Sequence, residues 1–441
     1  MTSLAGQLGS ASLVGADGRE YTRDDLSGLR ASASLAIDRP VALCLSDPVT
    51  LIRALTALDG QAATILLLSG ALDADTVRTL AERTGCGALV TDRDDLRDHS
   101  GAMAFEDATA PGAADAQATT TWLMTTSGTT GTPKVVPHTL KSLTRSVYRF
   151  TPKDAPNWGL LYDPTRFAGL QVTLQALVGG GRLLVVDTHE PIAAQIAALA
   201  ANGCTHLSAT PTLWRRVLMV PDHKALSLRQ ITLGGEIADQ ATIDALRAGF
   251  PDARVTHIYA STEAGVGFSV NDGKAGFPAD YLNIAPGGVR LKIVDDILWL
   301  RPPVGPSVAS AEIAVDAEGY IRSGDLIRAD GDRLHFLGRE NGLINVGGVK
   351  IYPETVEDTV KSVPGVALVQ VSSKKNPITG TLVVAEVQLA DGADAETTKQ
   401  AILDTCRARL VREAVPAIIR FVEGFETNAA GKLVRKGGAS A

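Results

Sequence analysis

Cysteine is scarce in this chain, and its few copies stand too far apart in the sequence to act together. The four occur at Cys44, Cys86, Cys204 and Cys406. This spacing excludes a disulfide framework and a cysteine zinc site, and it predicts buried, unreactive thiols of the kind kept in a reducing compartment. The seven histidines include no His-x-x-x-His pair, so we expect no structural metal.

Long apolar runs and one-sided charge are absent as well. No apolar run reaches the ~20 residues that a membrane helix needs, and the N-terminus lacks the basic start and apolar core of a signal peptide. The net charge is −7, with acidic and basic residues interleaved, which leaves no basic stripe for nucleic acid. We therefore expect a cytoplasmic protein without a membrane or nucleic-acid partner, either a monomer or a homodimer.

What the chain does have is length and a regular alternation of strands and helices. Its 441 residues exceed one ordinary core, so two or more domains are expected. Apolar strands at 40–45, 63–68 and 88–90 alternate with helical segments, and the same alternation continues from 170 to 259. This pattern predicts mostly parallel sheets covered on both faces, with 101–120 as a surface connection between strands.

The pattern of predicted secondary structure changes twice toward the C-terminus. Beyond residue 278 it becomes β-rich, with a hairpin expected from 288 to 300. After residue 338 a helix at 352–363 and three strands, with a second helix near 397–410, predict a small α+β domain. The fold class is therefore α/β. We expect a large N-terminal domain of layered sheets with a β-rich subdomain at 1–340, and a small mobile C-terminal domain at 341–441.

The most informative segment reads Thr-Ser-Gly-Thr-Thr-Gly-Thr-Pro-Lys at 126–134. Glycines let such a loop turn its backbone N–H groups inward as a nest for phosphate, while hydroxyls add donors and the lysine adds charge. It stands between two expected strands and lacks the Gly-Lys-Ser/Thr ending of a Walker A loop. A flexible surface loop is the alternative. The candidate phosphate ligands are Thr126, Ser127, Gly128, Thr129, Thr130, Gly131 and Lys134.

Four further segments have a physical use beside a nucleotide. The glycines of residues 234–236 could let the backbone lie flat against a planar base. The alternative is an ordinary strand-to-helix turn. Residues 259–263 offer a hydroxyl for phosphate and a carboxylate for Mg²⁺, or a helix N-cap. Asp325, expected in a tight turn, could accept ribose hydroxyls or form an Asx turn. Lys432 could be a mobile catalytic lysine or a solvated tail residue.

In this order, the segments resemble the adenylate-forming superfamily of acyl- and aryl-CoA synthetases, luciferases and peptide-synthetase adenylation domains, over nearly the whole chain. The loop at 126–134 matches the signature Ser-Gly-Thr-Thr-Gly-x-Pro-Lys. Residues 259–263 match Tyr-Gly-x-Thr-Glu with Ala260 for glycine. Residues 320–325 match Tyr-x-Arg/Lys-Thr-Gly-Asp with serine for threonine, and 338–357 match the hinge region and the start of the C-terminal domain.

The resemblance implies that a carboxylate attacks the α-phosphorus of Mg·ATP, and that a thiol then displaces AMP from the acyl-AMP. By this resemblance Lys432 is the catalytic lysine, Thr262 contacts the α-phosphate and Glu263 holds Mg²⁺. Asp325 takes the ribose hydroxyls, with Arg339 beside them. It also implies an adenine site, formed by Gly234, Gly235, Glu236 and Tyr259, and a swing of the C-terminal domain after adenylation.

Departures from the family pattern concern the hinge and the acid pocket. The hinge carries Asn341 and Gly342 where acidic or basic residues are usual. We align Phe167 with the gating aromatic and Ala168 with the Asp of amino-acid-activating relatives, which disfavours an α-amino acid. The neighbouring Arg166 either reaches a second anionic group or faces solvent, as exposed arginines usually do. Ala260 and Ser261 complete the expected substrate pocket.

Three hypotheses follow. The first is a ligase that adenylates a small aryl or short acyl carboxylic acid and transfers it to CoA. The second has the same first step, with the phosphopantetheine thiol of a carrier protein or an amine as acceptor. The third is a degenerate nucleotide-binding protein, which the presence of Lys134, Lys432 and the Thr262–Glu263 pair disfavours. A P-loop kinase is excluded because the loop lacks Gly-Lys-Ser/Thr.

Overall fold

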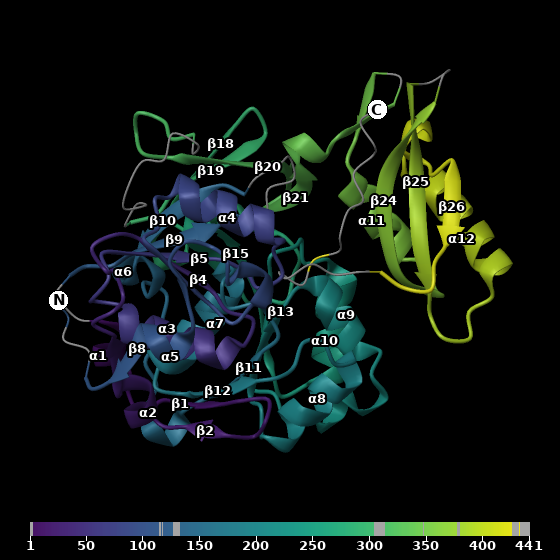
Figure 1. Cartoon of the computed structure of the whole chain (residues 1–441). Coiled ribbons are helices and arrows are strands. Elements are labelled where there is room, and N and C mark those ends of the chain that lie inside the picture. Colours follow the sequence, from purple (N-terminus) through teal and green to yellow (C-terminus); the bar gives the residue numbers. More distant parts are fainter. Residues whose placement is uncertain are drawn as a thin grey trace.

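The computed structural model describes residues 3–113, 116, 118–126, 133–303, 314–346, 348–376, 380–425 and 432. It contains layered α/β sheets followed by a separate group of C-terminal elements (Figure 1), so the predicted fold class is confirmed. No helix in these ranges is long and apolar enough to span a bilayer.

A six-stranded sheet holds the segment that leads into the glycine-rich loop. Its strand order is β10-β9-β5-β4-β6-β7, and only β10 runs antiparallel to its neighbour. The central strands are fully buried on both faces, as their continuous apolar runs predict. The strands are β4 (Val41–Cys44), β5 (Thr64–Leu67), β6 (Ala88–Thr91), β7 (Ala102–Met103), β9 (Thr121–Thr125) and β10 (Val135–Thr139).

An eight-stranded sheet in the order β16-β15-β14-β13-β11-β12-β1-β2 carries most of the candidate site. One hydrophobic core joins the two sheets, since buried residues of β4, β9, β11, β12 and the helices between them form one cluster. The strands are β1 (Ser12–Val14), β2 (Glu20–Tyr21), β11 (Asn157–Leu160), β12 (Arg182–Val185), β13 (His206–Ala209), β14 (Gln230–Gly234), β15 (Arg254–Ser261) and β16 (Gly265–Val270).

Helices connect many of these strands, as the alternation of strands and helical segments predicts. Asp47 illustrates how they begin: its carboxylate accepts the N–H groups of Val49 and Thr50, with Pro48 at the first helical position. The helices of this part are α1 (Leu4–Gln7), α2 (Arg23–Ser27), α3 (Pro48–Leu58), α4 (Ala74–Arg83), α5 (Phe105–Ala108), α6 (Leu140–Leu143), α7 (Phe167–Leu177), α8 (Ile192–Ala201), α9 (Pro211–Leu218) and α10 (Gln240–Gly249).

One expectation for this part was wrong. The segment 101–120 is not a plain surface connection, because it contains β7, α5 and β8 (Thr109–Pro111), which pairs with β3 (Leu29–Ala31). The N-terminal residues before position 40 are also structured, and β1 extends the eight-stranded sheet beside β12. A strand of three residues is too short to show a period in the sequence.

The β-rich part forms a five-stranded sheet in the order β17-β21-β20-β19-β18. The predicted hairpin is confirmed as β18 (Arg290–Val294) and β19 (Ile297–Arg301), turning at Asp295 and Asp296, both with positive φ. Asp325 lies within a strand and not in the expected tight turn. The remaining strands are β17 (Phe277–Pro278), β20 (Ile321–Asp330) and β21 (Arg333–Arg339).

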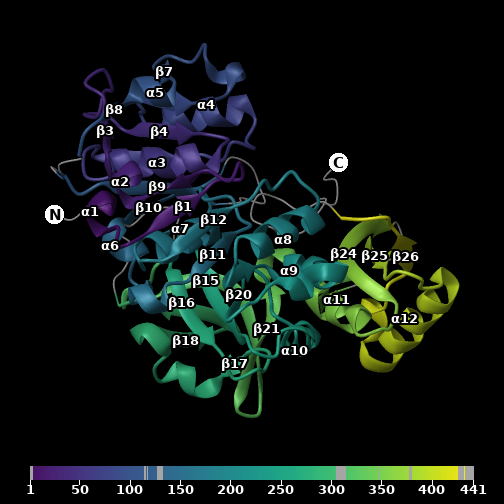
Figure 2. The ribbon, with the colours of Figure 1, turned by 90° about the horizontal axis from the view of Figure 1, so that it is seen from below.

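The C-terminal elements lie together to one side of the rest, next to α9 and α10 (Figure 2). Their own core includes Val356, Val360, Val369 and Ile402. The predicted three strands and two helices are present, with one hairpin in addition, β22 (Ile344–Val346) and β23 (Val349–Ile351). The others are α11 (Pro353–Lys361), β24 (Val366–Asn376), β25 (Gly380–Leu389), α12 (Ala395–Arg409) and β26 (Ile418–Phe421).

Candidate active site

Lys432, near the end of the chain, lies against the backbone that follows β14. A Cβ added at Gly235 would stand 3.2 Å from its Cε and 3.9 Å from its Nζ. The same point lies 3.6 Å from Cγ2 of Thr210, which follows β13. Lys432 is thus delivered to the carboxyl ends of two parallel strands, where open α/β sheets bind their ligands. It is half-buried and not a solvated tail residue.

The charges around Lys432 come from residues that the sequence had singled out in separate segments. Burial lowers the pKa of Lys432, the carboxylates of Glu236, Asp325 and Glu263 oppose that shift, and Arg339 adds to it. The interaction of two charges weakens as their separation grows, so these groups lie near Lys432. The fold therefore gathers five predicted residues, from separate segments between positions 236 and 432, into one polar site.

Asp325 is held in a fixed orientation by two neighbours. Its Oδ2 accepts a hydrogen bond from the Tyr259 hydroxyl at 2.5 Å, and its Oδ1 lies 3.3 Å from Nε of Arg339. Arg339 stands directly opposite Asp325 across β20 and β21, and its Nη2 donates to the Ser323 carbonyl at 2.7 Å. Burial raises the pKa of Asp325, with Arg339 and Tyr259 opposing the shift.

Tyr259 is fixed by stacking as well as by its hydroxyl. Its ring stacks on Phe268 and Phe336, with centroids 5.3 Å and 5.0 Å away. Burial beside Asp325 raises the pKa of the phenol, so Tyr259 stays a hydrogen-bond donor at neutral pH. Tyr259 therefore supports Asp325, and its predicted contact with adenine stays a prediction.

Glu236 faces the start of α9. Its Oε2 accepts the backbone N–H of Thr212 at 3.0 Å, and the Thr210 side chain caps the same helix by accepting from Leu213. A carboxylate at a helix N-terminus is stabilised by the helix dipole. Glu236 is therefore held at the start of α9, near Lys432. The sequence did not single out Tyr162, whose hydroxyl is buried near Glu236.

Thr262 and Glu263 occupy the turn between β15 and β16. A hairpin follows the strand, so the alternative of a helix N-cap is wrong. The Thr262 carbonyl accepts a hydrogen bond from Nε2 of His138 at 2.7 Å. His138 is 3% exposed, and burial lowers its pKa, which keeps the ring neutral. Sequence analysis missed His138 because nothing in its local pattern marks this long-range contact.

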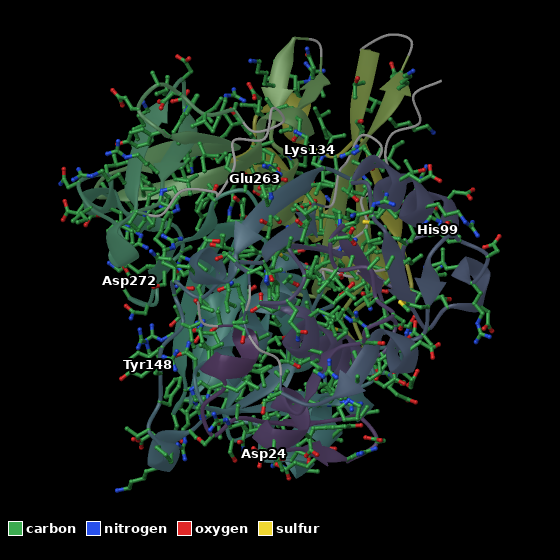
Figure 3. All side chains as sticks on the ribbon, turned by 60° about the vertical axis from the view of Figure 1, so that its left-hand side comes forward. Asp24, His99, Lys134, Tyr148, Glu263 and Asp272 are labelled. Carbon is green, nitrogen blue, oxygen red and sulfur yellow. The ribbon has the colours of Figure 1, made fainter. Side chains whose placement is uncertain are left out.

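The phosphate loop has strands on both sides, as predicted. Beyond the strands β9 and β10, the Thr126 N–H donates to the Lys134 carbonyl at 2.9 Å, so the two ends of the loop meet. In Figure 3 the labelled Lys134 and Glu263 lie in the same region of the view, consistent with the bond from His138 to Thr262. Five predicted ligands lie outside the described residues: Ser127, Gly128, Thr129, Thr130 and Gly131.

The residues predicted to line the acid pocket lie at the start of α7 and at the end of β15, and the pocket itself stays a prediction. Cζ of Phe167 comes within 3.9 Å of the Cβ position of Gly265, which is paired with Ser261 on β15. Ala168 and Ala260 are partly buried and pack against the same core. The expectation that Arg166 faces solvent was wrong. Its Nη1 donates to the carbonyl and hydroxyl of Thr125 at 3.2 Å and 3.1 Å.

The predicted hinge residues, Asn341 and Gly342, lie in a single 3₁₀ turn, Glu340–Gly342, between β21 and β22. Glu340 pairs with Arg322 at 2.9 Å. Which residue pivots stays a prediction, as does the domain boundary at 340/341.

The arrangement fits a nucleotide. The left-handed φ of +81° at Gly235 and the nearness of Lys432 disfavour a side chain there, and the predicted contact of this backbone with a base stays a prediction. Asp325 offers fixed carboxylate oxygens for hydroxyl groups. No cluster of three or more metal-ligating side chains occurs among the residues that the structure describes. Magnesium is usually held by one or two carboxylates together with phosphate oxygens, and Glu263 is the predicted carboxylate.

Two family models match the chain. One, described as AMP-binding enzyme, covers residues 27–315, and the other, described as AMP-binding enzyme C-terminal domain, covers residues 355–432. The second match ends at Lys432.

Curated relatives are similar at modest identity. A feruloyl-CoA synthase from Amycolatopsis sp is 28% identical over 348 residues, covering 71% of this chain and 68% of the relative. A 2-succinylbenzoate–CoA ligase from Salmonella typhimurium is 29% identical over 297 residues, covering 61% of this chain and 58% of the relative.

Solved structures share the fold. An anthranilate CoA ligase in complex with anthranoyl-AMP superposes with a TM-score of 0.75 at 18% identity, covering 96% of this chain and 92% of the other. The o-succinylbenzoate CoA synthetase of Bacillus subtilis with its acyl-adenylate gives 0.74 at 21% identity, covering 98% and 97%.

Proposed function

Because the chain belongs to the AMP-binding enzyme family, we propose that it adenylates a small aryl or short acyl carboxylic acid with ATP and transfers the acyl group to CoA. The observation that carries this proposal is the position of Lys432 beside Gly235, among the carboxylates of Glu236, Asp325 and Glu263. The names of the feruloyl and 2-succinylbenzoate relatives favour an aryl acid and CoA.

In the first half-reaction the residues position two anions and offset their charge. Asp325, oriented by Tyr259 and Arg339, accepts the ribose hydroxyls. Lys432 meets the charge that develops on the carboxylate and α-phosphate oxygens, together with Thr262. Lys134 and the loop 126–134 hold the pyrophosphate portion. Mg²⁺, held by Glu263, would neutralise phosphate charge when bound.

In the second half-reaction Lys432 must leave. It reaches the site only at the end of a chain that passes through the C-terminal elements, so a rotation of those elements about 341–342 would withdraw it. Its withdrawal would open the reaction centre to the thiol. Attack of the thiol on the acyl-AMP would then form the thioester and release AMP.

The test is to mix the purified protein with Mg·ATP and a panel of carboxylic acids. Acid-dependent formation of AMP and pyrophosphate is the expected result, and formation of ADP, or no turnover with any acid, would overturn the proposal. Repeating the assay with CoA, a carrier protein or an amine identifies the acceptor. A thioester with CoA supports the proposal, and a product with only one of the other acceptors overturns its second half.

A further inference from the structure

Arg145, which sequence analysis did not single out, presents a guanidinium group at the acid pocket. It follows α6 and is half-buried. Its Nη2 donates to the Val266 carbonyl on β16 and lies 3.5 Å from the Cβ position of Gly265. The ring tip of Phe167 comes within 3.9 Å of that same position. Arg145 and the gating aromatic therefore meet over Gly265.

The charge of Arg145 has no acidic partner among the described residues. Its one hydrogen bond in the described structure goes to a backbone carbonyl, and no carboxylate contributes to the shift of its pKa. Burial alone lowers its pKa. A half-buried cation without a counter-ion is costly unless something compensates it.

Most of the hydrogen-bonding capacity of Arg145 also remains unused. A guanidinium has five N–H donors, and the described structure shows one hydrogen bond from Arg145. None of its nitrogen atoms is among the buried polar atoms that lack a partner. The remaining donors are therefore open to water or to a ligand in the pocket.

The position of Arg145 relative to the reacting residues limits the size of that ligand. Gly265 pairs with Ser261, which directly precedes Thr262 and Glu263, and such paired Cα atoms lie about 5 Å apart. The path from Arg145 through Gly265 and Ser261 to Thr262 is therefore short, which suits a small acid that presents one carboxylate at Thr262. A second anionic group that reaches Arg145 would form a charge-assisted pair with the guanidinium.

Arg166 adds to the positive charge on this side of the pocket. It is also half-buried and makes no ion pair within the described residues, although Asp163 is close enough to affect its pKa. Its guanidinium is held at Thr125, at the root of the phosphate loop. Arg166 therefore contributes charge while Arg145 keeps free donors.

We propose that Arg145 binds a second carboxylate of the substrate, so that the acid is a small aryl or short acyl dicarboxylic acid. The inference rests on the proposed function, since it names the substrate class of the same site. The competing explanation is that Arg145 only clamps β16 through the Val266 carbonyl. Glutamine at this position keeps an N–H donor for that clamp but removes the charge.

The experiment measures pyrophosphate release with matched pairs of acids, one member bearing a second carboxylate and the other a methyl group in its place. The unmodified protein should show the higher kcat/KM for the diacid. Arg145→Gln should lower kcat/KM for the diacid on the order of 10–100-fold, mainly through KM, because a hydrogen bond to a charged group is worth that much. The monoacid and ATP values should stay unchanged.

Arg149→Gln is the matched control, since Arg149 is exposed and bonds only Gln7 in the described structure. Thermal unfolding checks that both variants fold. If Arg145→Gln does not fold, the diacid-to-monoacid ratio of the unmodified protein still decides. A ratio of one or less, or an equal loss on both acids in the variant, overturns this inference while leaving adenylation intact. No turnover with any acid overturns the proposed function itself.

Discussion

At the scale of single residues, the site depends on charged side chains that neighbouring groups hold in fixed positions. Lys432 is half-buried and surrounded by three carboxylates and one guanidinium. Asp325 has one oxygen fixed by Tyr259 and the other by Arg339. Each group is held by the protein before any substrate arrives, so little reorganisation is needed during the reaction.

The pH dependence of adenylation tests whether burial lowers the pKa of Lys432. Burial lowers its pKa, so on raising the pH it loses its proton, and with it the charge that assists the reaction, earlier than an exposed lysine does. Single-turnover adenylation should fall on the alkaline side below the ordinary lysine range. Lys432→Arg should keep residual activity without this alkaline fall, because arginine stays charged. An unchanged alkaline limb in the arginine variant would assign it to another group.

At the scale of elements, the site consists of strand ends. The segment after β14 carries Gly235 at φ +81°, while Gly234 has an ordinary φ and its added Cβ would be 3.8 Å from the nearest atom. Gly234 can therefore accept a side chain more readily than Gly235, although the two glycines are adjacent in the sequence.

Gly235→Ala should destabilise the protein by about 1–2 kcal/mol, the cost of a left-handed φ for an L-residue. It should also reduce adenylation by at least about tenfold, since its methyl group would displace the side chain of Lys432. Thermal unfolding and pyrophosphate release measure the two effects. Gly234→Ala is the control and should change neither by much. Comparable losses in both variants would argue against a specific contact at Gly235.

Much of this layout is predictable from sequence, and the failures have physical causes. Alternating apolar strands and helices predicted the sheets, and the glycine-rich and acidic motifs predicted residues that the fold brings around Lys432. The strands β1 and β22–β23 are too short to show a period. Arg166 bonds Thr125, and His138 bonds Thr262 across 124 positions, so neither contact follows from local pattern. Arg145 was missed for the same reason.

At the scale of the whole molecule, two ion pairs face each other between the larger part and the C-terminal elements. Arg215 and Asp239 pair at 2.7 Å on the side of α9 and α10, and Lys361 and Asp358 pair at 3.4 Å on α11. The pKa of Asp239 is lowered: burial opposes the shift, and the charges of Arg215 and Lys361 outweigh it. The four charges thus interact across the interface in the arrangement that holds Lys432 at the site.

Removing one of these charges should loosen that arrangement. Lys361→Met leaves two carboxylates facing one arginine, so adenylation should fall roughly tenfold, the range expected for a partly buried pair. Thioester formation from supplied acyl-AMP should not fall. Lys399→Met is the control, since Lys399 is on α12 and pairs only loosely with Glu396 at 3.9 Å. Equal effects of the two variants would contradict a role for the interface.

The central claim is that Lys432 serves the first half-reaction and must leave for the second. The most direct measurement compares the two half-reactions in Lys432→Ala. Adenylation, followed as acid-dependent pyrophosphate release, should fall by orders of magnitude, because the charge at the α-phosphate is lost. Thioester formation from supplied acyl-AMP and CoA should remain largely intact. An equal loss in both half-reactions would contradict the account.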